Sequence, residues 1–173
     1  MADCVNALKE WTGKARATTI FDSTVDEFTA DGLFAKVKGK PNVAIVGFTT
    51  DGDVFGKFYT VAVTEQDKYF NDPNNFVFSF ESHGRCMTPQ RFAVKEKRKA
   101  YVNFWKNKHK GFASFGVYPA CIFWLGNERS GSYVHNLSCG FEGIKDTTLT
   151  GKNGNWREGP CYHCTQLVAI QLE

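Results

Sequence analysis

The apolar residues at the start of the chain recur at helical spacing. Val5, Leu8 and Trp11 are three residues apart, and Gly13 follows them. This pattern predicts a short amphipathic helix that ends near the glycine, because one apolar stripe can then pack against the rest of the protein. The residues at 18–21 predict a brief strand after it.

A second helix is predicted behind Thr24. Thr24 and Glu27 have the spacing of a capping box, in which each side chain satisfies a free backbone N–H at the start of a helix. Gly39 and Pro41 are typical of the residues that follow a helix. The apolar stripe of this helix comprises Phe28, Leu33, Phe34 and Val37.

From residue 43 onward the apolar period changes to two. An apolar run at 43–48, the turn dipeptide Asp51-Gly52 and the alternating residues 54–63 together predict a β-hairpin. The phenylalanines in 76–80 alternate with other residues, which predicts a strand with one face in the core. Many strands after two helices indicate an α+β fold built on antiparallel sheets. Further strands are predicted at 101–105, 120–125 and 167–172.

The composition indicates one folded domain spanning 1–173. The chain has 173 residues, of which 42% are hydrophobic, 15% aromatic and 23% charged. A chain of this length buries roughly 70% of its unfolded surface, so it needs neither a disulfide nor a metal to form a core. Its many aromatic residues and ordinary charged fraction exclude a disordered chain.

The positive charge is concentrated in residues 91–110, here called the basic segment. The chain carries 21 Lys and Arg against 18 Asp and Glu, a formal net charge of +3. The basic segment holds eight of the cations and one acid, a local +7, which leaves 13 cations and 17 acids, or −4, elsewhere. It is therefore the first candidate contact surface. Besides Arg91, its cations are Lys95, Lys97, Arg98, Lys99, Lys106, Lys108 and Lys110.

Two hypotheses for the basic segment stay open. Its cations are interleaved with aromatic residues, and a charged surface with stacking rings is how proteins hold single-stranded nucleic acid. Alternation along a strand places Tyr101 and Trp105 on one face and Phe104 on the other, so some of these rings belong to the core. The alternative is a solvated hairpin whose cations protect a sheet edge. No recognised nucleic-acid-binding motif accompanies the segment.

The sharpest cluster of possible metal ligands lies near the end of the chain. Cys161, His163 and Cys164 could bind Zn²⁺, with Cys139 or His135 as a fourth ligand. However, zinc sites normally space their ligands by two or more residues, whereas His163 and Cys164 are neighbours. The alternative is a strand entry with small, half-buried thiols. We expect no metal and no cofactor.

Signatures of catalysis are missing from the sequence. Neither glycine-rich phosphate-binding motif occurs, and the string around Ser114 has Phe112 where a nucleophile elbow requires its first glycine. Asp51 and Asp53 supply too few oxygens for a Ca²⁺ loop. No family-type signature surrounds any cysteine or histidine. We therefore expect a non-enzymatic protein.

The N-terminus lacks the cationic and apolar blocks of a signal peptide, and no apolar run approaches the ~20 residues of a membrane span. These features predict a cytoplasmic protein with no membrane insertion. In that compartment the six cysteines are expected to be free thiols.

Several motifs, in this order along the chain, resemble those of the TLDc domain family. After the helix with Trp11 comes Ile20-Phe21-Asp22-Ser23, and the apolar strand and turn lead into Phe55-Gly56, where the family typically has Phe-Gly. The segment 76–80 is similar to the family's Phe-Leu-Phe-Ser-Leu strand. The aromatic segment 123–127 and the Ser-Gly-Ser step that follows it are similar to a later part of the family pattern. The final Glu-Val-Trp of the family is Ile-Gln-Leu here, and the basic segment is this chain's own.

The resemblance covers most of the chain and implies a β-sandwich of two antiparallel sheets flanked by short helices. It also implies an interaction role, because the family is linked to protection against oxidative stress and several members bind the vacuolar proton-pumping ATPase and affect its assembly. It implies no catalytic residue and no cofactor. The expectation is a TLDc-type interaction domain whose protein partner is a proton-pump subunit. Nucleic-acid binding through 91–110 is the alternative.

Overall fold

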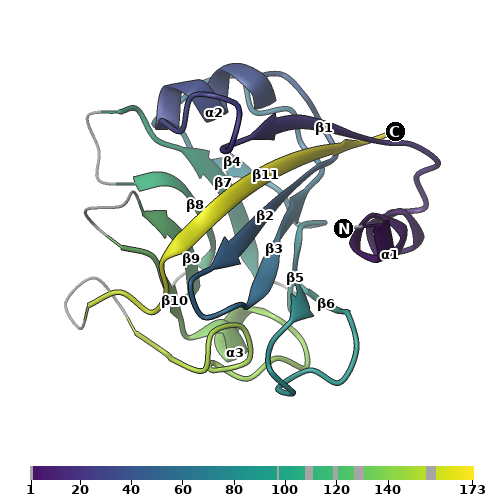
Figure 1. Cartoon of the computed structure of the whole chain (residues 1–173), viewed down its shortest axis with the longest axis vertical. Coiled ribbons are helices and arrows are strands. Elements are labelled where there is room, and N and C mark those ends of the chain that lie inside the picture. Colours follow the sequence, from purple (N-terminus) through teal and green to yellow (C-terminus); the bar gives the residue numbers. More distant parts are fainter. Residues whose placement is uncertain (1, 97, 108–110, 119–120, 127–130, 155–158) are drawn as a thin grey trace.

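The computed structural model describes residues 2–96, 98–107, 111–118, 121–126, 131–154 and 159–173, and these form two antiparallel sheets with short helices around them (Figure 1). The helices are α1 (Ala2–Thr12), α2 (Ala30–Val37) and α3 (Leu137–Gly140). The strands are β1 (Ala17–Asp22), β2 (Val43–Thr49), β3 (Val54–Tyr59), β4 (Phe70–Asn71), β5 (Phe76–Glu81), β6 (Gln90–Ala93), β7 (Lys99–Phe104), β8 (Gly111–Tyr118), β9 (Cys121–Gly126), β10 (Tyr133–His135) and β11 (Cys164–Leu172).

The strand order mixes distant parts of the sequence. The six-stranded sheet has the order β1-β11-β2-β3-β5-β6, and the five-stranded sheet has the order β10-β9-β8-β7-β4. The last strand, β11, thus lies between β1 and β2, two of the first strands of the chain, which brings both termini to the same side of the molecule in Figure 1. The predicted α+β fold with two antiparallel sheets is confirmed.

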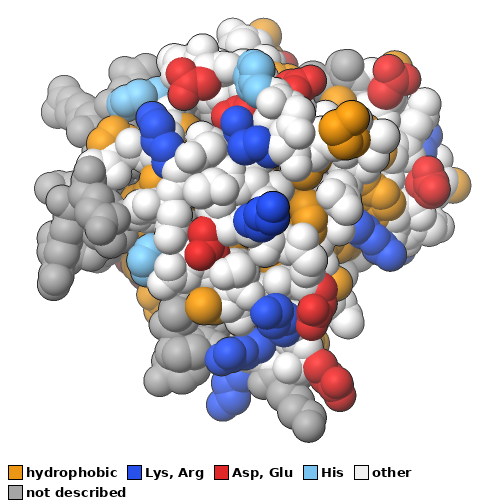
Figure 2. Space-filling view, turned by 90° about the horizontal axis from the view of Figure 1, so that it is seen from below, with side chains coloured by type: hydrophobic (Ala, Val, Ile, Leu, Met, Phe, Trp, Pro, Cys, Tyr) orange, Lys and Arg blue, Asp and Glu red, His pale blue; other side chains and the backbone are white. Residues whose placement is uncertain are grey.

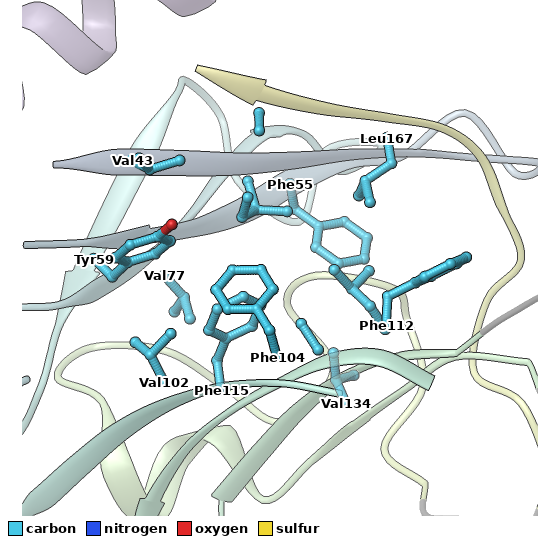
Figure 3. Packing of buried hydrophobic residues seen from close by; sticks show 14 of the residues in the cluster. Val43, Phe55, Tyr59, Val77, Val102, Phe104, Phe112, Phe115, Val134 and Leu167 are labelled. Atoms are coloured by element: carbon cyan, nitrogen blue, oxygen red, sulfur yellow. The ribbon is translucent and has the colours of Figure 1, made fainter. Parts of the chain in front are cut away.

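The core lies between the two sheets (Figure 3). Val43, Phe55 and Tyr59 from β2 and β3 face Phe104 and Phe115 from β7 and β8. Each of these side chains is fully buried. Because successive strand residues alternate between faces, the opposite residues of the same strands point out of the sandwich.

A lysine also points into this core. Lys57 lies between Phe55 and Tyr59 on the inward face of β3 and is fully buried. Its ammonium nitrogen is 4.4 Å from the centroid of the Phe141 ring. This cation–π contact offsets part of the cost of removing the charge from water.

The outer face of the six-stranded sheet is covered by α1. Leu8 is fully buried there, and the Trp11 ring stacks on Phe80 at 5.7 Å with an interplanar angle of 9°. Trp11 also contacts Phe76 and Phe78. The phenylalanines of β5 therefore face the helix, whereas Val77 between them faces the sandwich core, and both faces of β5 are buried. The prediction of one buried face was incomplete.

The second helix begins later than its capping box predicts. The residue that caps α2 is Thr29, whose Oγ1 accepts a hydrogen bond from the backbone N–H of Gly32 at 3.0 Å. Thr24 instead donates from its backbone N–H and its hydroxyl to the carboxylate of Asp22. The carboxylate of Asp26 accepts from the backbone N–H of Asp22, so these side chains fold a turn and start no helix.

Strand β8 was not predicted, although it lies at the centre of the five-stranded sheet. A register shift between Gly111 and Ala113 interrupts its alternation, so that Phe112 and Ala113 both belong to the core. Gly116 opposite Tyr101 leaves room for the tyrosine ring, which a Cβ at that position would overlap. Because of these small residues and the register shift, the sequence of β8 lacks the regular alternation of apolar and polar residues that predicts a strand.

Candidate functional site

The described residues of the basic segment do not form one surface. Arg91 lies on β6 at the edge of the six-stranded sheet and donates from Nη1 to the backbone carbonyl of Trp11 at 2.6 Å. Lys95 donates from Nζ to the carbonyl of Ser138 in α3 at 2.7 Å. Both cations therefore hold helices in place. The sequence hypothesis grouped them with cations that the structure puts on the other sheet.

The remaining described cations of the basic segment lie at the two ends of β7. Arg98 and Lys99 are exposed at its start, and Lys106 is exposed just after its end. The Nζ of Lys106 is 3.8 Å from a carboxylate oxygen of Asp67. The other candidate positions, Lys97, Lys108 and Lys110, lie outside the described residues.

Three aromatic rings form a cluster beside these cations. The Tyr69 ring is perpendicular to the Tyr101 ring at 4.9 Å between centroids and to the Trp105 ring at 6.2 Å. Tyr69 is 59% exposed, and Tyr101 and Trp105 are half-buried. We call Tyr69, Tyr101 and Trp105 the aromatic cluster. Tyr101 and Trp105 belong to the basic segment, whereas Tyr69 lies more than 20 positions before its start, so no local pattern connects the three rings.

The proposed zinc ligands do not converge on one point. Cys161 is buried, and its thiol is 3.7 Å from the carbonyl of Val134. The thiol of Cys164 donates to the carbonyl of Gln166 at 3.0 Å, and His163 between them is exposed. Among the described residues there is no group of three or more His, Cys, Asp or Glu side chains that could hold a metal ion.

The thiols differ in their expected reactivity. Burial raises the pKa of Cys164 to about 11, so its thiol is protonated at neutral pH, whereas Cys139 is exposed on α3. Since the thiolate is the nucleophile, iodoacetamide is expected to alkylate Cys139 roughly ten-fold or more faster than Cys164 in the native protein at neutral pH. Peptide mass spectrometry over a time course measures both rates. Denaturant provides the control, since both thiols should then react alike; native rates that are equal would contradict the prediction.

A cluster of charged side chains joins three loops at the end of the molecule near α3. The carboxylate of Asp53, just before β3, is only 3% exposed, and its Oδ1 accepts from Nη2 of Arg85 at 2.5 Å. The Nδ1 of His83 is 2.9 Å from the same oxygen. Arg85 also donates to the carbonyls of Thr148 and Leu149 at 2.9 and 3.1 Å. The guanidinium thus connects the β2–β3 turn, the β5–β6 connection and the segment after α3.

The connection between β5 and β6, residues 82–89, is ordered by further hydrogen bonds; we call it the β5–β6 loop. The N–H groups of His83 and Ser82 donate to Oε1 of Glu81 at 2.7 and 2.9 Å, and they lower the pKa of that carboxyl group. The N–H of Cys86 donates to Oγ of Ser82 at 2.7 Å. Next to this frame, Met87 is 91% exposed. A fixed loop therefore displays a large apolar side chain.

Neither the buried ion pair nor the exposed methionine was predicted. In the sequence, Asp53 stands out only as a possible Ca²⁺ ligand in a hairpin turn. Its partner Arg85 is 32 residues away in the chain, and no local spacing connects the two. Seen from this end, the surface mixes cationic, anionic and histidine side chains with scattered hydrophobic ones (Figure 2).

The fold defines the protein as an α+β domain of two antiparallel sheets. A family model described as the TLDc domain matches residues 3–154, and the chain therefore belongs to the TLDc family. No curated protein matched the sequence. Within the described residues, none of the helices is both long enough and apolar enough to cross a membrane.

Proposed function

We propose that this TLDc domain is a non-enzymatic interaction module that acts in the cytoplasm through a protein partner. The observation that carries the proposal is the family match over residues 3–154. The partner we propose is a subunit of the vacuolar proton-pumping ATPase, and the cellular role is protection against oxidative stress, as the family resemblance implies.

The β5–β6 loop is our candidate for the contact with that partner. Its backbone is held by Glu81 and Ser82, and Arg85 connects it to Asp53. Such a loop loses little conformational entropy on binding, because it is already ordered in the free protein. Methionine suits a contact surface since its flexible, polarisable side chain adapts to the partner's shape.

Affinity capture tests the partner and the loop together. The full chain, immobilised and exposed to a lysate, is expected to retain a proton-pump subunit that quantitative mass spectrometry identifies. Met87→Asp should reduce the capture roughly ten-fold, because it places a charge in a contact that excludes water. Val25→Asp is the matched control, since Val25 is 84% exposed at another site.

Three results would contradict these proposals separately. Recovery of no pump subunit would overturn the proposed partner. Capture that Met87→Asp leaves unchanged would overturn the contact through the β5–β6 loop. A single serine or cysteine that an activity-based probe labels with enhanced rate would overturn the non-enzymatic role.

A further inference from the structure

The outer face of the five-stranded sheet around β7 combines aromatic, cationic and amide side chains. Ala100, Val102 and Phe104 of β7 point into the core, so the alternate residues point outward. The outward side chains are Lys99, Tyr101, Asn103 and, just past the strand, Trp105. Tyr69 stands against two of them. We call Tyr69, Lys99, Tyr101, Asn103 and Trp105 the β7 face.

At the centre of the β7 face lies a side-chain amide that no described residue hydrogen-bonds. Asn103 is fully buried, and neither Oδ1 nor Nδ2 of its side chain has a hydrogen-bond partner among the described residues. The hydroxyl of Ser114, opposite Asn103 on β8, is 3% exposed and likewise has none. Buried polar groups are nearly always hydrogen-bonded, because leaving one unpaired destabilises the folded state. A ligand with both donors and acceptors would satisfy this amide.

Exposed cations lie at both ends of the β7 face, where the phosphates of a ligand could pair with them. Lys99 and Arg98 are exposed at the start of β7, and neither side chain has an ion pair with another described residue. Acids lie nearby as well. Asp31 accepts hydrogen bonds from Gln66, which also bonds the carbonyl of Trp105, and from the N–H of Asn107. Two further acids are each beside a lysine. The carboxylate of Asp67 is 3.8 Å from Lys106, and that of Glu65 is 2.9 Å from Lys68.

We propose that the β7 face binds single-stranded nucleic acid. Bases would stack on the exposed ring of Tyr69 and on Trp105, and phosphates would contact Lys99 and Lys106. The amide of Asn103 would pair with a base edge, which requires the side chains that bury it to move apart on binding. A duplex does not fit, because its bases are stacked on one another and cannot reach the rings. A single strand offers a flat base with every phosphate, whereas an acidic peptide offers a ring only where an aromatic residue interrupts its acids, so nucleic acid accounts for more of the observations.

Fluorescence polarisation with labelled single strands of RNA and DNA tests the proposal. Strands of about 16 nucleotides are long enough, because this is the upper site size of a single OB-fold domain that binds single strands. The wild type is expected to bind at about 50 mM salt and to bind more weakly as the salt concentration is raised. Lys99→Gln should reduce the slope of log K against log salt concentration by about 0.7, the value for one phosphate contact to a single strand. Tyr69→Ala should weaken binding by about 5-fold or more, the effect of losing one stacked base. Tyr69→Phe keeps the ring and should bind as the wild type does.

Asn103→Leu separates binding from stability. It removes two unpaired polar atoms at nearly constant volume, so the melting temperature should stay the same or rise by a few degrees, while affinity falls about 5-fold. An amide with a purely structural role would give a lower melting temperature and unchanged affinity. Lys38→Gln, an exposed cation at the end of α2, is the control for net charge.

The following results would overturn the proposal. The first is failure of the wild type to bind any single strand at low salt. The second is equal affinity for a matched duplex together with insensitivity to Tyr69→Ala, which would indicate nonspecific attraction to cations. The third is a protein partner whose binding depends on Tyr69 and Asn103 while nucleic acid does not compete with it.

Discussion

Arg85→Met is expected to lower the free energy of unfolding by about 3 kcal/mol, because it leaves the buried carboxylate of Asp53 without its cation. Asp53 is 3% exposed, and His83, the other group at this carboxylate, is 55% exposed on its side chain. The substitution also removes the hydrogen bonds from Arg85 to two backbone carbonyls after α3. For a domain of this size the melting temperature should fall by about 6 to 12 °C. Urea denaturation gives the free energy directly.

A double-mutant cycle distinguishes the ion pair from simple loss of packing. Asp53→Asn combined with Arg85→Met removes both charges, and the double variant should be more stable than the sum of the two single effects predicts. His83→Ala serves as a milder control, since solvent already reaches that ring. Single effects that add without coupling would show that the pair itself contributes nothing. A loss below about 1 kcal/mol for Arg85→Met would place the pair among ordinary surface ion pairs.

Among substitutions that add a single methyl group to a strand residue, Gly56→Ala is expected to lower the stability of the fold the most. A Cβ at Gly56 would overlap the carbonyl oxygen of Ile45 on β2 and would lie 2.6 Å from Cζ of Phe78 on β5. The backbone of β2 cannot move away without breaking its pairing with β3, so the loss of stability should reach about 3 kcal/mol, the upper range for overpacking. Thermal denaturation followed by circular dichroism measures it. The Phe55-Gly56 step of the family resemblance thus has a steric reason in this chain.

Gly47→Ala is the matched control for Gly56→Ala. Gly47 lies on β2, pairs with Phe55, and its added Cβ would meet neighbours at 3.7 and 3.8 Å, which is ordinary contact. The change at Gly47 should therefore be within about 1 kcal/mol of the wild type. Equal effects of the two substitutions would show that these strands need the backbone freedom of glycine, and that steric overlap of a Cβ at Gly56 is not the cause.

Local patterns predicted the elements that depend on local interactions. The hairpin of β2 and β3 was predicted from one apolar run, one turn dipeptide and alternation, and the structure has it with Val46 opposite Gly56. The α1 helix was predicted from the spacing of Val5, Leu8 and Trp11, and its last helical residue is Thr12. The predicted start of α2 was wrong, because Thr24 and Thr29 are equally suitable N-cap residues by residue type. The carboxylates around Thr24 favour a turn there.

The candidate sites were predicted less completely than the fold. The basic segment includes Lys99, Tyr101 and Trp105, which lie on one face. It also included Arg91 and Lys95, whose charged groups bond backbone carbonyls of α1 and α3. Composition counts charges along the chain, and it cannot distinguish a cation that fixes a helix from one that faces solvent.

The sequence by itself determined the class of fold, the main hairpin, the first helix and the family, since each rests on neighbouring residues or on motifs in a fixed order. Only the tertiary structure decided which side chains meet across the sheets. It paired Asp53 with Arg85, placed Tyr69 against Trp105, and left the amide of Asn103 without a described partner. The physical reason is that strand pairing brings together residues that are tens of positions apart, and burial then sets the energy of each contact.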